Sequence, residues 1–114
     1  MKKLIETLVG IPSACGHEQD VIRYLRDYLC NNVDSWEIDG IGNLIVKKEG
    51  AHPGPVLMVS AHSDEVGFIV KKIEESGLIR FEKLGGNDDR ILPAEPVLVC
   101  TDNGPLYGVI GFIS

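Results

Sequence analysis

Residues 56–67 have the sequence VLMVSAHSDEVG, an apolar run that is followed at once by a histidine and two acids. The run predicts a strand over residues 56–61 with polar side chains at its carboxyl end. Open α/β sheets bind ligands beyond the carboxyl ends of their strands, because the strand fixes the backbone and the loop beyond it forms a crevice. The sequence therefore marks His62 and Asp64 as candidate functional residues.

The spacing of His62 and Asp64 places their side chains together. Residues two apart on a strand point to the same face, whereas Ser63 and Glu65 would face the other way. A metal-bound imidazole commonly has a carboxylate behind it that fixes its tautomer, and His-x-Asp supplies that pair locally. A single His-x-Asp is also what a solvated histidine at a strand end looks like. The role of Glu65 stays open.

Composition and charge exclude several classes of protein. The 114 residues are 44% hydrophobic and 25% charged, which fits an ordered globular protein. The net charge is −6 and basic residues occur singly or in pairs, so no nucleic-acid partner is expected. No apolar run approaches the roughly 18 residues of a membrane span. Three widely spaced cysteines favour a reducing cytoplasm over a disulfide framework.

Hydrophobic periodicity predicts helices only in the first third of the chain. Apolar residues recur at helical spacing over residues 4–9 and again over 21–29. Residues 36–46 read as a β-hairpin with turn residues at 39–43. From residue 66 onward, short strands at roughly ten-residue spacing predict a small antiparallel barrel or sandwich. The acids after the glycines at 85–86 are predicted to form a turn, because a calcium loop needs a longer ligand series.

The last six residues, VIGFIS at 109–114, are mostly apolar. Domain ends are usually exposed and polar, so this ending predicts a piece of a longer protein, with an apolar strand whose partner lies outside the sequence. The alternative is a true terminus in which this strand is tied into a sheet.

Four motifs in order resemble those of a known family. GNLIV at 42–46, AHSDEVGFIV at 61–70, LGG at 84–86 and GVIG at 108–111 are similar to the motifs of the glutamyl and tetrahedral aminopeptidases. These are dinuclear metallopeptidases, and some members are named as cellulases or endoglucanases. The resemblance implies an α/β fold: residues 1–67 would start a catalytic domain, and residues 68–114 would form the first strands of an inserted small β-barrel dimerisation domain, cut before its end.

The resemblance also implies an activity. It gives His62 the role of ligand to one of two divalent ions, zinc or cobalt and in some cases manganese, and Asp64 the role of orienting that ligand. The whole enzyme would be a cytoplasmic homo-oligomer that removes amino-terminal residues from peptides. The remaining ligands and the general base fall beyond the matched stretch. Because catalytic zinc normally needs three protein ligands, we expect these 114 residues alone to be inactive and to bind zinc weakly.

One turn departs from the sequence pattern of the aminopeptidase family. Where the family commonly has Leu-Pro-Gly-Gln, this chain has Ala94 and Glu95 after Leu92-Pro93, and Pro96 follows. Ala94 adopts positive φ less easily than glycine and Pro96 lacks an N–H, which places the geometry of that turn in question.

The rival function is a non-catalytic β-rich module that self-associates through an apolar strand edge.

Overall fold

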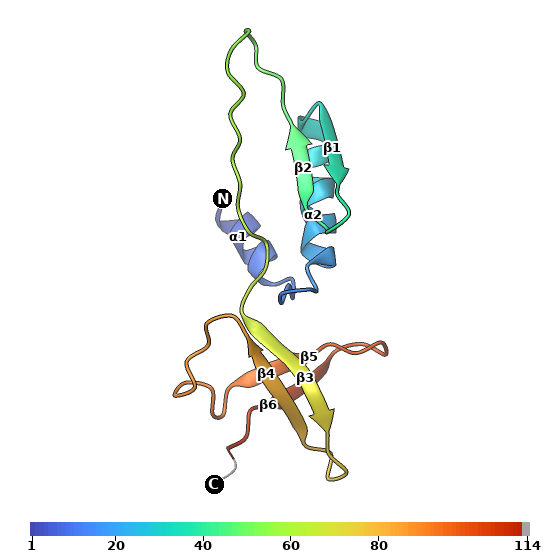
Figure 1. The fold of residues 1–114 in the computed structure, drawn as a ribbon, viewed down its shortest axis with the longest axis vertical. Coiled ribbons are helices and arrows are strands. Elements are labelled where there is room, and N and C mark those ends of the chain that lie inside the picture. The colour runs from blue at the N-terminus through green and yellow to red at the C-terminus, as the bar shows by residue number, and fades with distance from the viewer. Residues whose placement is uncertain (113–114) are drawn as a thin grey trace.

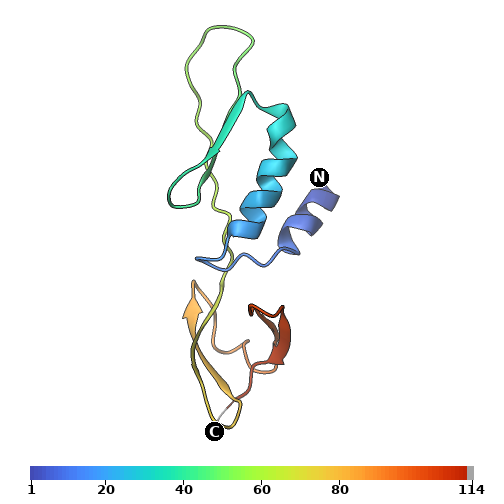
Figure 2. The same cartoon turned by 90° about the vertical axis from the view of Figure 1, so that its right-hand side faces the viewer.

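Two groups of elements lie at opposite ends of an elongated chain (Figures 1 and 2). The structure, a computed structural model, describes residues 1–112 and measures 64 × 30 × 27 Å. Helices α1 and α2 and the β1–β2 hairpin form one group, and strands β3 to β6 form the other. In the part described, no helix is long and apolar enough to cross a membrane.

The two predicted helices are confirmed. Helix α1 spans Lys2–Val9 and helix α2 spans Gln19–Leu29, followed by the 3-10 turn η1 at Cys30–Asn32. Asp20 in the first turn of α2 and Arg26 in its last turn complement the helix dipole. Val21 on α2 is buried, with 4% of its surface exposed. The Arg26 guanidinium also lies 5.7 Å from the centre of the Trp36 ring, which joins α2 to the neighbouring hairpin.

The predicted hairpin is confirmed as β1, Ser35–Ile38, paired antiparallel with β2, Leu44–Lys47. Its turn is built around Asp39. One carboxylate oxygen accepts the backbone N–H groups of Ile41 and Asn43 at 3.0 and 2.9 Å, and the other accepts the Asn43 side-chain amide at 2.8 Å. The Asp39 side chain thus reinforces a turn that two backbone hydrogen bonds also close, from the Asp39 N–H to the Asn43 carbonyl and from the Gly42 N–H to the Asp39 carbonyl.

The predicted strand over residues 56–61 is wrong for this structure. The segment leads back from the loop at residues 48–55 without pairing to any described strand, and Val56 and Leu57 are 95% and 85% exposed. A strand exists only when a neighbour accepts and donates its ladder hydrogen bonds, and residues 1–112 supply no such neighbour here. The apolar run is present, and its partner is not among the described residues.

The second half of the chain forms two hairpins. Strand β3, Gly67–Ile73, pairs antiparallel with β4, Ile79–Leu84, and β5, Pro96–Val99, pairs with β6, Leu106–Val109. The described residues form only two-stranded sheets, so the predicted barrel or sandwich is not confirmed. Strand β6 ends at Val109, and residues 113–114 of the expected terminal strand lie outside the described part.

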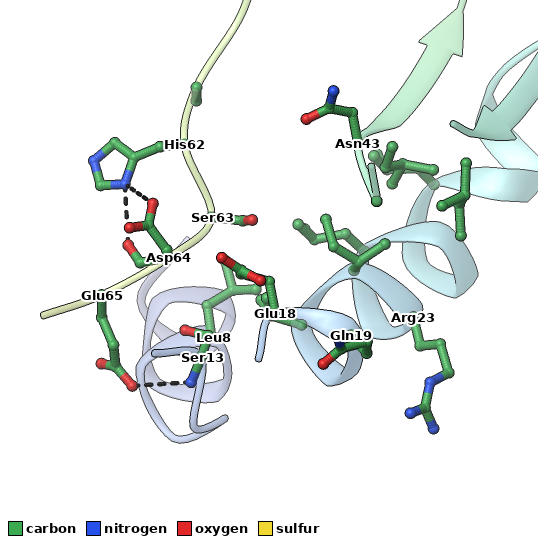
Figure 3. Close-up of a pocket in the computed structure, with 18 of the residues that line it drawn as sticks. Leu8, Ser13, Glu18, Gln19, Arg23, Asn43, His62, Ser63, Asp64 and Glu65 are labelled. Atoms are coloured by element: carbon green, nitrogen blue, oxygen red, sulfur yellow. Dashed lines mark hydrogen bonds and ion pairs between the residues drawn. The ribbon is translucent and has the colours of Figure 1, made fainter. Parts of the chain in front are cut away.

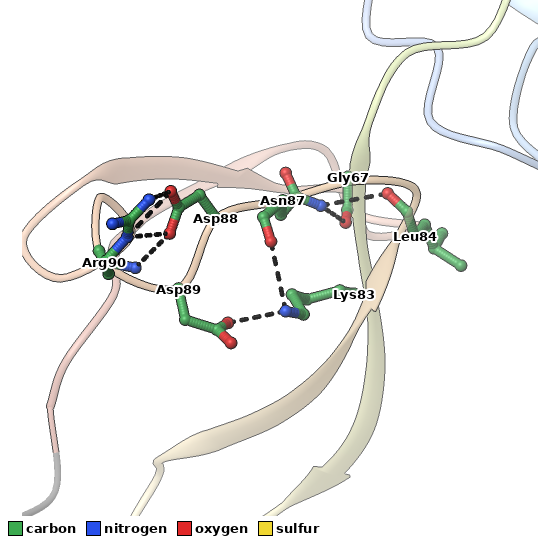
Figure 4. Close-up of polar contacts among 7 residues, drawn as sticks. All are labelled: Gly67, Lys83, Leu84, Asn87, Asp88, Asp89 and Arg90. Carbon is green, nitrogen blue, oxygen red and sulfur yellow. Dashed lines mark hydrogen bonds and ion pairs between the residues drawn. The ribbon is translucent and has the colours of Figure 1, made fainter.

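The loop after β4 is held by polar contacts (Figure 4). The Asn87 side-chain amide donates to the carbonyl oxygens of Gly67 and Leu84, both at 3.2 Å, which locks the loop to the start of β3. Asp88 pairs with Arg90 at 2.6 Å and Asp89 pairs with Lys83 at 2.8 Å. Both acids therefore form ion pairs within this turn.

Ala94 adopts the left-handed conformation that favours glycine. Its φ is +68°, and its N–H donates to the Ile110 carbonyl at 2.9 Å. Pro96 stands at the first position of β5, where a missing N–H is tolerated. The turn therefore carries strain at Ala94, because the left-handed conformation costs an L-residue with a Cβ about 1–2 kcal/mol.

We predict that Ala94→Gly raises the free energy of unfolding by about 1 kcal/mol, because it relieves this strain. Urea unfolding followed by the amide signals of β5 and β6 measures it. The control is Ala51→Gly, in an exposed loop where the alanine has no positive φ; it should be neutral or slightly destabilising. Equal effects of the two substitutions would contradict the strain.

We predict a pH-dependent β1–β2 turn. Hydrogen bonds from Asn43, first from its side chain and then from its backbone, lower the pKa of Asp39 below its ordinary value of 3.8. Because the folded-state pKa is the lower one, the stabilisation is complete above that ordinary value and is lost as pH falls through the folded pKa. The NMR chemical shift of the Asn43 amide should therefore change as the pH falls into the acidic range. Asp39→Ala should abolish that change, whereas Asp102→Ala should preserve it.

Candidate functional site

Residues 61–65 border an open cleft between the helices and β2 (Figure 3). The cleft has a volume of about 790 Å³. Its walls include apolar side chains from both helices and from β2, among them Leu8, Ile22 and Leu44, and its opposite border includes His62 and Asp64. The candidate polar residues thus lie at the edge of a largely apolar surface.

His62 and Asp64 are in direct contact, although no strand places them there. The His62 Nδ1 atom lies 3.0 Å from an Asp64 carboxylate oxygen and 3.0 Å from the Asp64 carbonyl oxygen. A carbonyl oxygen only accepts, so these contacts favour the tautomer with the proton on Nδ1. Nε2 then keeps its lone pair, and the His62 side chain is 85% exposed. The roles of metal ligand and orienting carboxylate stay predictions.

The described part of the chain does not by itself assemble a metal centre. Within residues 1–112, no three side chains of His, Cys, Asp or Glu gather closely enough to hold a metal ion. An exposed imidazole with a carboxylate on Nδ1 fits the chemistry of a single ligand and its orienter. Any further ligands would have to come from other polypeptide.

Glu65 has a defined contact that the sequence did not predict. Its carboxylate accepts the Ser13 backbone N–H at 3.1 Å, and its own N–H donates to the Ser13 carbonyl at 2.9 Å. Ser13, in the break between α1 and α2, is buried, with 5% exposed. The two residues are 52 positions apart, and no local sequence pattern at either of them predicts this contact.

The chain belongs to the M42 glutamyl aminopeptidase family, whose profile matches residues 42–114. It is 36% identical to the lysyl aminopeptidase of Pyrococcus furiosus over 114 residues, which cover 99% of this chain and 31% of that one. This chain thus spans about a third of that relative's length. The family resemblance inferred from the ordered motifs is confirmed.

Solved structures agree with this assignment. An endoglucanase from Thermotoga maritima matches with a TM-score of 0.84 at 39% identity, covering 94% of this chain and 33% of its own. The TET1 peptidase of Pyrococcus horikoshii, described as assembling into a tetrahedron or a large octahedral shell, matches with a TM-score of 0.82 at 36% identity, covering 94% and 32%. The two helices and small sheets therefore follow the fold of this family.

We predict that Gly67→Ala disrupts the junction between Ser13-Ala14 and Glu65. A Cβ at Gly67 would lie 2.8 Å from the Ala14 Cβ, too close without a backbone shift. The expected loss of stability is about 1–3 kcal/mol, the usual range for overpacking. Urea unfolding measures it, with Gly86→Ala as the control because nothing lies within 4 Å of that Cβ. A loss no larger than the control's would show that the contact is not tight.

Proposed function

We propose that this chain forms part of a metal-dependent aminopeptidase that removes amino-terminal residues from peptides. The observation that carries the proposal is the His62–Asp64 pair, with Nδ1 occupied and Nε2 available on an exposed ring. The family membership and the lysyl aminopeptidase relative support the activity. Because the chain spans about a third of that relative, the complete active site would include residues from further polypeptide.

His62 would hold one metal ion through Nε2, and Asp64 would keep the ring in the tautomer that leaves Nε2 free. When bound, the pair of divalent ions supplies Lewis-acid polarisation of the peptide carbonyl and activation of water. Zinc, cobalt and manganese all accept imidazole with carboxylates, so the proposal names this class of ions. Asp64 acts on the ring alone, because its carboxylate is turned toward Nδ1.

The exposed apolar surface supports a larger catalytic unit. The cleft is open and largely apolar, and Met58 and Val59, in the segment that leads to its border at Ala61, are 85% and 84% exposed. Apolar surface of this extent is usually covered by other polypeptide. We assign residues 1–67 to the catalytic α/β domain and residues 68–114 to the inserted β-barrel dimerisation domain. The assembly described for the Pyrococcus horikoshii relative supports a homo-oligomer, and three free cysteines support a cytoplasmic location.

The test is a chimera in which this chain replaces the matching part of the Pyrococcus furiosus lysyl aminopeptidase. With zinc or cobalt, the chimera should release amino-terminal residues from chromogenic peptides, whereas the isolated chain should not. Asp64→Ala should lower activity by roughly 10–100-fold, the usual effect of removing the carboxylate behind a ligand, and His62→Ala should lower it further.

The matched control is His52→Ala, which removes an exposed histidine from the neighbouring loop and should leave activity unchanged. Full activity in a folded His62→Ala chimera would refute the metal-ligand role. A folded but inactive wild-type chimera, together with concentration-dependent self-association of the isolated chain, would favour the non-catalytic association module instead.

A further inference from the structure

The segment that carries His62 is tied to the rest of the protein mainly at its ends. Among the described residues, 50–64 make no backbone hydrogen bond to a helix or strand. At one end the Glu49 N–H donates to the Asp34 carboxylate, and at the other Glu65 meets Ser13. The position of His62 therefore depends most on the attachment at Glu65, three residues away.

That attachment consists of two hydrogen bonds and a close packing contact. Glu65 and Ser13 exchange a backbone bond at 2.9 Å and a carboxylate bond at 3.1 Å, and Ala14 forms an isolated parallel bridge with Glu65. The carboxylate bond is charge-assisted and part-buried, which makes it stronger than a neutral hydrogen bond in water. Gly67 packs against Ala14 immediately beyond it.

The side chains of Asp64 and Glu65 point to different sides of the backbone and have different partners (Figure 3). Asp64 turns toward His62, and Glu65 turns the other way, to Ser13. Ser13 belongs to the connection between α1 and α2, the two helices that line the cleft. Fixing Glu65 to Ser13 thus fixes the His62–Asp64 pair relative to the cleft wall.

We propose that Glu65 is a positioning residue, which holds the His62–Asp64 pair at the edge of the cleft by binding the Ser13 backbone. The use of that pair in catalysis rests on the proposed function, but its placement by Glu65 does not. Glu65 touches neither the imidazole nor the Asp64 carboxylate in this arrangement and acts through the backbone between them. An amide oxygen at position 65 would accept the same hydrogen bond, so Gln is the conservative substitute.

The test measures the bond and the placement separately in the metal-free chain. Amide hydrogen exchange at Ser13 reports the bond. The placement is measured with a nitroxide label on exposed Cys15, in a chain whose Cys30 and Cys100 are changed to serine. The nitroxide speeds the relaxation of nearby protons, so its effect on the His62 ring protons shows whether His62 stays close to the Ser13 connection. The amide signals of α2 verify that each variant is folded.

Glu65→Ala should speed Ser13 exchange by about tenfold or more, as expected for losing a hydrogen bond to a charged group, and should weaken the nitroxide effect on His62. Glu65→Gln should restore most of both signals. Glu75→Ala, the same change at an exposed glutamate, should leave both as they are. If Glu65→Ala unfolds α2, Ser13→Pro removes the donor N–H from the other side of the bond, together with the serine hydroxyl and the freedom of φ at residue 13, and in a chain that keeps its α2 amide signals it should displace His62 in the same way.

Two results would overturn the proposal. One is faster Ser13 exchange with an unchanged nitroxide effect on His62, which would make Glu65 purely structural. The other is a Glu65→Gln chain that behaves like Glu65→Ala. Because neither measurement uses metal or substrate, an inactive chimera would count against the proposed function and leave this result standing.

Discussion

The contact between Ser13-Ala14 and Glu65 is the constraint on which the rest of the arrangement depends. It joins the connection between the two helices to the point where the chain leaves residues 50–64 and enters β3. The same few residues therefore set the border of the cleft, the position of the His-x-Asp pair and the direction of the first hairpin in the second half. The close approach of Gly67 to Ala14 shows how little room this junction has.

Elsewhere the chain is held together by local contacts rather than by a shared core. Val21 at 4% and Ile110 at 8% exposure are the buried apolar residues of the part that the structure describes. Each of the three hairpins is closed by its own turn: all three turns contain a glycine with positive φ, and the first also uses the Asp39 side chain. Two-stranded hairpins of this kind gain most of their stability by packing on something else. Their exposed apolar faces are consistent with a chain that spans about a third of its relative.

Sequence patterns predicted the elements whose information is local. Helical periodicity located α1 and α2, and the turn residues at 39–43 located the first hairpin, because each depends on neighbours within a few positions. The apolar run at 56–61 failed as a strand because a strand needs a partner, which periodicity does not provide. The Ser13–Glu65 contact was beyond prediction for a related reason: two ordinary polar residues meet across 52 positions. Ala94 shows the reverse case, where the surrounding turn overrides an unfavourable residue.

The His62–Asp64 contact forms although residues 56–61 are not a strand, because the two residues can meet through local hydrogen bonds. Nδ1 lies 3.0 Å from both an Asp64 carboxylate oxygen and the Asp64 carbonyl oxygen, so the two-residue spacing brings the groups together here without a strand. Such local closure explains why His-x-Asp alone is a weak signal: it orients a ring without requiring a site. What distinguishes this pair is its surroundings, an open apolar cleft on one side and the Glu65 attachment on the other. In the proposed arrangement, the histidine and its aspartate supply the chemistry, and Glu65 with the helix connection it binds supplies their placement.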